Sequence, residues 1–182
     1  SSLSLKTLAQ IKPEAVFPEL LESIFPDLET VLQTHRTQAA LEVLGYTCRP
    51  LLWRQHYAGG AEHLLALLSL TLPGIDPNDL VKTHATLKFY SYVLMAVPMH
   101  DESNLKEHGE LTETELKIKQ STAGFADWGI QLLQRVLVLY SLCVEGQTGK
   151  QTSMESIIHM PVQQLCSLLF MQADEETYGT LL

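Results

Sequence analysis

The chain has 182 residues, of which 46% are hydrophobic and only 18% charged, so it is long enough for one domain with a sizeable core. Its 21 acidic and 12 basic residues give a net charge of -9, which argues against non-specific nucleic-acid binding, because that binding needs a positive field. No apolar run approaches the roughly 18 residues that a membrane span requires, and no signal-peptide pattern opens the chain. The sequence therefore predicts a soluble intracellular protein without direct nucleic-acid or membrane contacts.

Apolar residues recur at helical spacing along most of the chain, and no sustained two-residue alternation indicates strands. The opening "SSLSLKTLAQ" has no initiator Met and no clear helix start, so we expect a piece of a longer protein. The pattern predicts helices over residues 18–34, 37–52, 61–72, 78–97, 112–140 (interrupted near Gly124) and 152–173.

Short connections between consecutive predicted helices make them antiparallel neighbours. The pairs recur at a spacing near 40 residues, which is typical of HEAT repeats. The sequence therefore predicts an all-α fold, a HEAT/armadillo-like α-solenoid of antiparallel helix pairs. Residues 1–182 are expected to form a single segment of this kind, with an acidic inter-helix loop over residues 100–111.

Several residues indicate where helices begin and end. Thr112 with Glu115 forms a capping-box pattern, and "TSME" at 152–155 repeats it. Pro161 predicts a kink or break in the last helix. In the turn "LPGIDPND", Asp76 is expected to cap the following helix and Pro77 to occupy its first position.

Candidate metal ligands and nucleophiles form no recognised motif. His56, His63, His100 and His108, with Asp101, could be combined into a metal site, but no HExxH or CxxC pattern supports it. The histidines are therefore read as surface or packed residues. Neither a GxSxG elbow nor an EF-hand pattern occurs.

The remaining motifs have equally ordinary interpretations. "GQTGKQT" at 146–152 departs from a phosphate loop and is read as a linker. The cysteines are expected to be free thiols: Cys48, Cys143 and Cys166. The aromatic side chains in "KFYSYVLMAV" are expected to pack in the core: Phe89, Tyr90 and Tyr92. The sequence thus predicts no catalytic, cofactor or metal site and no enzyme.

Four segments nevertheless follow one another in a specific order: "LPGIDPNDLVKT", "VPMHD", "LTETEL" and "STAGFADW", preceded by "HYAGGAEHLLALL". Together they resemble the large single-chain HEAT-repeat activators of the 20S proteasome, the family of proteasome activator complex subunit 4 and its fungal bleomycin-sensitivity homologue. The resemblance spans roughly residues 56–142, in an interior part of a far longer family sequence. Trp128 stands where the family usually has Phe.

The resemblance implies a scaffold segment of an ATP-independent activator that caps the 20S core particle and influences gate opening and substrate entry. It further implies a nuclear and cytoplasmic location and acetylated histones as substrates. Family domes bind inositol polyphosphates, but Lys117 and Lys119 are too few for such a site here, and we expect no cofactor. Tyr178 is not penultimate in "EETYGTLL", so the family's docking tail is not expected in this segment. The alternative is a generic helical-repeat adaptor or a small α-helical enzyme.

Overall fold

The computed structural model describes residues 2–29, 34–103, 111–145 and 153–172, and within these residues the fold is all α, as predicted. Apolar residues at helical spacing and the capping residues described below account for most of the elements. The elements in chain order are α1 (Ser2–Ile11), α2 (Pro13–Glu29), α3 (Thr34–Leu52), α4 (Ala58–Ala61), α5 (Leu64–Thr71), the short 3₁₀ helix η1 (Leu72–Gly74), α6 (Leu80–Ala96), α7 (Glu113–Thr122), α8 (Phe125–Glu145) and α9 (Ser153–Gln172).

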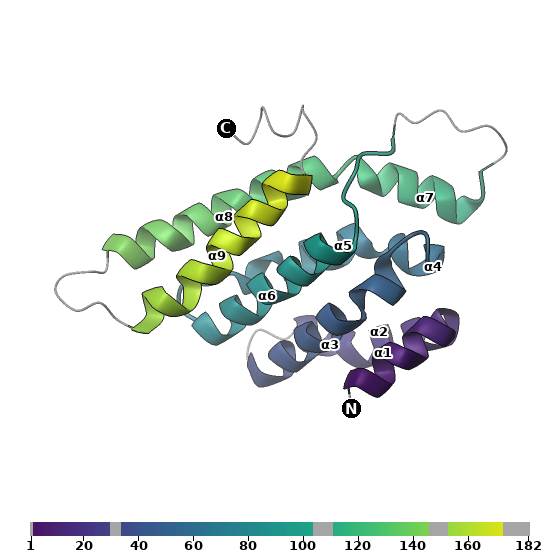
Figure 1. Cartoon of the computed structure of the whole chain (residues 1–182), viewed down its shortest axis with the longest axis horizontal. Helices are drawn as coiled ribbons and strands as arrows, with labels where there is room; N and C mark the ends of the chain where they lie inside the picture. Colours follow the sequence, from purple (N-terminus) through teal and green to yellow (C-terminus); the bar gives the residue numbers. More distant parts are fainter. Residues whose placement is uncertain (1, 30–33, 104–110, 146–152, 173–182) are drawn as a thin grey trace.

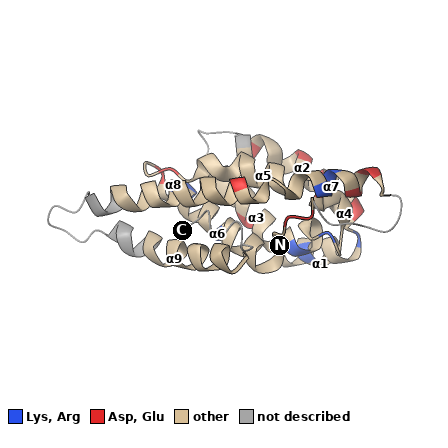
Figure 2. Ribbon diagram, turned by 90° about the horizontal axis from the view of Figure 1, so that it is seen from above, with Lys and Arg blue, Asp and Glu red and all other residues tan. Residues whose placement is uncertain are grey.

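The helices lie in two layers. Figure 1 shows α9, α6, α3 and α1 side by side in one row, and neighbours in this row are in direct contact. The second row consists of α8, α5 and α2, and the view from above in Figure 2 shows the two rows one over the other. Helices α2 and α3 are in contact, as are α8 and α9, and hydrogen bonds from Tyr90 join α6 to α5. These are successive pairs across the layers, so the predicted solenoid of helix pairs is confirmed.

Helices α3 and α6 run parallel, since both their beginnings and their later turns are in contact. The hydroxyl of Thr34 donates to the carboxylate of Asp79, with 2.7 Å between the oxygens. Nearly four turns further along both helices, the Cys48 thiol donates to the carbonyl of Tyr92 at 3.6 Å. Equivalent helices of two successive pairs therefore stack in register.

The core lies between the two layers and extends along the whole stack. Leu41 and Leu44 from α3 belong to the same buried cluster as side chains of α5 and α6, among them Leu68 and Tyr90. The hydroxyl of Tyr90 donates to the carbonyl of Leu68 at 2.9 Å. The same hydroxyl lies 3.0 Å from the hydroxyl of Thr71. Phe89 is also buried, whereas Tyr92 is only half-buried, so core packing is confirmed for the first two aromatic residues and partly for the third.

Several predicted helix boundaries are wrong. The helix expected over 18–34 is α2, which spans Pro13–Glu29, and Thr34 already belongs to α3. The opening residues, where the sequence shows no clear helix start, form α1, which buries Ala9 and packs against α3. The predicted helix over 61–72 is divided into α4 and α5 by a turn at Glu62 and His63. Pro161 does not break α9, because Ile158, Val162 and Leu165 are buried along that helix, and this packing offsets the cost of the proline.

The cap of α6 also differs from the prediction. Asp79, not Asp76, is the N-cap: its carboxylate accepts from the backbone N–H of Lys82 at 3.0 Å. Asp76 instead accepts from the backbone N–H of Asn78 at 2.8 Å, and Pro77 lies in the turn before the helix. Ala85, on the buried face of α6, belongs to the core.

The capping box at α7 is confirmed, with the side chains of Thr112 and Glu115 each accepting from the other's backbone N–H. The second predicted box, at 152–155, lies outside the side chains that the structure describes. Most of the predicted acidic loop, residues 104–110, is also outside the described residues, while His100–Ser103 and Leu111 are non-helical. Gly124 does mark the break between α7 and α8, as predicted.

Candidate functional site

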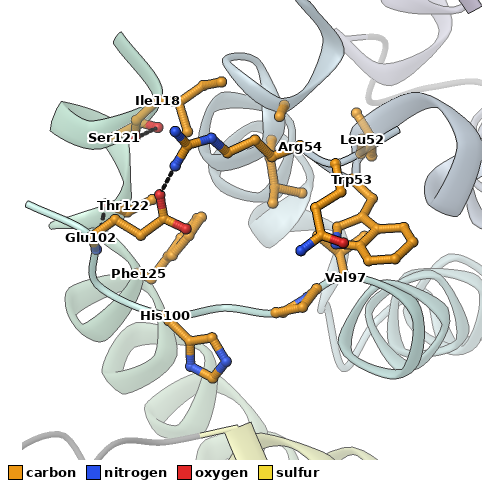
Figure 3. A pocket seen from close by; sticks show the side chains of 14 residues that line it. Leu52, Trp53, Arg54, Val97, His100, Glu102, Ile118, Ser121, Thr122 and Phe125 are labelled. Carbon is orange, nitrogen blue, oxygen red and sulfur yellow. Dashed lines mark hydrogen bonds and ion pairs between the residues drawn. The ribbon is translucent and has the colours of Figure 1, made fainter. Parts of the chain in front are cut away.

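A cavity of about 520 Å³ lies where the end of α3 meets α4, α7 and the segment that follows α6 (Figure 3). A volume of this size is typical of a small-molecule or side-chain site. Most of its wall is apolar, formed by residues from all of these elements. They are Leu52, Ala61, Leu64, Val97, Pro98, Ile118 and Phe125.

The polar end of the cavity is closed by an ion pair. The guanidinium of Arg54, just after α3, contacts the carboxylate of Glu102 (Figure 3). The backbone N–H of Glu102 donates to the hydroxyl of Thr122 at 2.9 Å. Glu102 therefore connects the end of α3 to α7, and both charged side chains remain about a quarter to a third exposed.

The described lining residues do not form a catalytic arrangement. The hydroxyl of Ser121 donates to the carbonyl of Ile118, and that of Thr122 to the carbonyl of Lys119, both at 2.9 Å. Both hydroxyl protons are therefore used in hydrogen bonds within α7. His100 is exposed at the edge of the cavity. An activated nucleophile needs a base within hydrogen-bond reach, and no such pair is present among the described lining residues. The geometry suits the binding of an apolar group and the joining of α3 to α7.

The residues considered for a metal site have other surroundings. The ring of His63 packs 5.5 Å from that of Phe17, and its Nε2 lies 3.4 Å from a carboxylate oxygen of Glu62. His56 is exposed in the turn after α3. Within the described part of the chain, no group of three His, Cys, Asp or Glu side chains could hold a metal ion. His108 lies outside that part.

The described thiols are free and buried to different degrees. Burial raises the pKa of the Cys48 thiol to about 11, and burial also raises the pKa of Cys166. Since the thiolate is the reactive form, neither is suited to nucleophilic chemistry at neutral pH. The side chain of Cys143 and the predicted linker at 146–152 lie outside the described residues.

No sequence motif marks the two charged residues at the polar end of the cavity. Arg54 and Glu102 are separated by a long stretch of chain and belong to no motif, so only the fold brings them together. Asp79 could have been found, because it directly precedes the first apolar residue of α6 and its carboxylate can accept from the first turn.

The described helices include none that is long and apolar enough to cross a membrane. The whole of residues 1–182 matches the sequence profile of a family described as proteasome activator complex subunit 4, mid HEAT repeats region. This match is longer than the expected residues 56–142, so the expected extent of the resemblance was too short.

Individual relatives agree with this match. The chain is 32% identical to proteasome activator complex subunit 4B of Danio rerio and to proteasome activator complex subunit 4 of Xenopus laevis, with 98% of the chain aligned in both. It is also 32% identical to the Homo sapiens protein of the latter name, over 96% of the chain. The aligned part is 10% of the length of each relative. This chain belongs to the proteasome activator complex subunit 4 family, in which it corresponds to the middle HEAT-repeat region.

Proposed function

We propose that the chain is a non-enzymatic wall segment of an ATP-independent activator that caps the 20S core particle and influences gate opening and substrate entry. The observation that carries this proposal is the family match along the whole of residues 1–182. The activator's docking and gating elements would lie elsewhere in the same protein, and the segment would supply shape and rigidity.

The two ends of the helix stack support a place within a longer solenoid. At one end, Leu3, Leu8 and Ile11 of α1 are more than half exposed. At the other, α8 and α9 expose apolar side chains and carry few charged residues (Figure 2). They include Leu137, Val138, Leu142, Met160 and Met171. In repeat proteins such apolar ends are covered by neighbouring repeats or by polar caps.

Other parts of the proposal rest on the family alone: a nuclear and cytoplasmic location, and acetylated histones as substrates of the parent protein. The parent's inositol polyphosphate site would lie outside this segment. Within this segment, the Lys117 ammonium lies 2.9 Å from a carboxylate oxygen of Glu113. This ion pair makes Lys117 less available to bind a phosphate group.

A native pulldown of the full natural protein that contains this chain tests the proposal. The eluate is passed through a sizing column and assayed for peptidase activity without ATP. We expect proteasome-inhibitor-sensitive activity to co-elute with the protein. A protein that elutes alone, with no core-particle subunits, would overturn the proposal and favour the helical-repeat adaptor.

A further inference from the structure

One exposed face of the stack combines aromatic and basic side chains. Tyr46 and Arg49 are three residues apart on one face of α3, and Trp53 directly follows the end of that helix. Lys88 and Tyr92 lie on α6, next to α3 in the same row. We call these five residues the α3–α6 stripe.

Direct contacts hold the stripe in place. The Arg49 guanidinium lies 5.3 Å from the centre of the Trp53 ring, and the Lys88 ammonium lies 5.9 Å from that of Tyr92. The rings of Tyr46 and Tyr92 are 5.5 Å apart. Both distances from cation to ring fall within the range of cation–π attraction. The charged groups are thus positioned before any partner arrives.

A glycine allows this arrangement across the two helices. A Cβ atom on Gly45 would lie 2.6 Å from Cδ2 of Tyr92, so the tyrosine ring occupies the space that a side chain at this position would fill. Tyr46 is 39% exposed even so. The stripe therefore offers ring surface to solvent on a fixed backbone.

The stripe differs in charge from the chain as a whole. Its two cations are Arg49 and Lys88, and the acid beside it is Glu42, one turn before Tyr46 on α3 and close enough to act on Tyr92. With Glu42 included, the charge there is +1. The whole chain has a net charge of -9. A basic face on an acidic protein selects acidic partners, because the rest of the surface repels them.

The stripe leads into the cavity described above. Trp53 belongs to both: Arg49 lies over its ring, and the residue also lines the cavity, followed by Arg54 (Figure 3). An extended chain lying along α3 would meet aromatic rings and two cations first. It would then reach an apolar hollow of about 520 Å³, large enough for a bulky side chain.

We propose that the α3–α6 stripe and the adjoining cavity bind an extended acidic peptide segment of a protein partner, with an apolar side chain inserted beside Trp53. The carboxylates of the peptide pair with Arg49 and Lys88, and its backbone lies over Tyr46 and Tyr92. This proposal does not depend on docking to the core particle, so it can fail without affecting the proposed function.

Fluorescence anisotropy on the full natural protein tests the proposal, with a short labelled peptide that alternates Glu and Phe as the probe. The double variant R49Q/K88Q should bind about three- to tenfold more weakly, because each exposed charge pair contributes modestly. Tyr46→Ser should also weaken peptide binding. Added salt should weaken peptide binding by the wild-type protein more than binding by the double variant.

A matched variant, K12Q/K117Q, removes the same charge from exposed lysines outside the stripe and should bind as the wild type does. Equal binding of a peptide with Lys in place of Glu would overturn the proposal, and so would equal loss in the two double variants. A third contrary result is binding of a labelled oligo-dT strand, lost in R49Q/K88Q, without binding of the acidic peptide. That would make the stripe a nucleic-acid surface.

Discussion

The Thr34 hydroxyl donates a hydrogen bond of 2.7 Å to the carboxylate of Asp79, and the same carboxylate accepts from the backbone N–H of Lys82. One acidic side chain thus caps α6 and fastens the beginning of α3 to it. Because α3 and α6 belong to successive pairs, this contact fixes the register between two repeats.

Replacing Asp79 by Ala should destabilise the fold by about 1 to 2 kcal/mol, because the first turn of α6 loses its cap and the Thr34 hydroxyl loses its acceptor. Hydrogen exchange of the amides at the beginning of α6 and chemical unfolding would measure the effect. Asp76→Ala is the control, since the Asp76 carboxylate bonds only to Asn78, within the turn, in the described contacts. An equal or larger loss of stability in Asp76→Ala would show that Asp76 is the capping residue of α6, as expected from the sequence.

The Asp79 contact should depend on pH. Partial burial acts to raise the pKa of Asp79, but the Lys82 N–H, the Thr34 hydroxyl and the Lys82 charge outweigh it, so the pKa lies below its ordinary value. The charge therefore stabilises the fold fully above the ordinary aspartate pKa of about 4. This contribution is lost as the pH falls through the lowered pKa of the folded state.

The free energy of unfolding, compared between the wild type and Asp79→Asn across acidic pH, measures this contribution. The difference should be constant near neutrality and should vanish below the folded-state pKa of Asp79. A difference that persists in strong acid would show that the amide distorts the cap and that charge is not the cause.

Gln172 should be the most important polar residue of α9. Its amide nitrogen donates to the carbonyl of Leu94 at 2.7 Å, and its amide oxygen accepts from the Met99 N–H at 3.2 Å. Gln172→Ala should cost about 1 to 3 kcal/mol, because partly buried backbone groups at the end of α6 lose their partners. Faster hydrogen exchange at Met99 would locate the effect.

Gln163→Ala serves as the comparison, because that residue is exposed on the same helix. Gln172→Glu separates the two bonds, since a carboxylate can accept from Met99 but cannot donate to Leu94. Gln172→Glu should therefore fall between the wild type and Gln172→Ala in stability. Unchanged exchange at Met99 in Gln172→Ala would contradict the assigned role.

Two glycine substitutions should have opposite effects. A Cβ atom on Gly60 would lie 1.7 Å from the carbonyl oxygen of Leu51, so Gly60→Ala must move backbone and should cost about 1 to 3 kcal/mol. A Cβ atom on Gly129, inside α8, would lie 3.4 Å from Cδ1 of Leu169, which is an ordinary packing distance. Gly129→Ala should stabilise the protein by up to about 1 kcal/mol through helix propensity.

Thermal unfolding of these two variants beside the wild type would measure both effects. A neutral Gly60→Ala would mean that α4 does not pack on the end of α3 as described. A destabilising Gly129→Ala would mean that α8 and α9 are closer together than the structure shows.

The sequence predicted features that depend on local contacts. The Thr112–Glu115 box was found because both partners lie within one helical turn, where residue type and spacing are sufficient. The apolar spacing likewise identified most helices and their pairing. The family resemblance came from motif order, which is more specific than the repeat period.

Features that depend on tertiary packing could not be predicted in this way. Pro161 is accommodated because buried neighbours hold α9 in place, and α1 forms because it packs on α3. The cavity is closed by Arg54 and Glu102, whose approach depends on the turn after α3 and on the segment after α6. The Asp79 cap was missed because an Asp-Pro pattern three residues earlier offered a competing cap.

The direct packing of α6 on α9 has a mechanical consequence. The chain leaves α6 at Ala96 and returns to the same row at Ser153, with α7 and α8 in between. Tension along the row would pass from α3 through α6 to α9, and α7 would carry little of it. A reporter domain inserted between α6 and α7 should therefore leave the stiffness of the row unchanged.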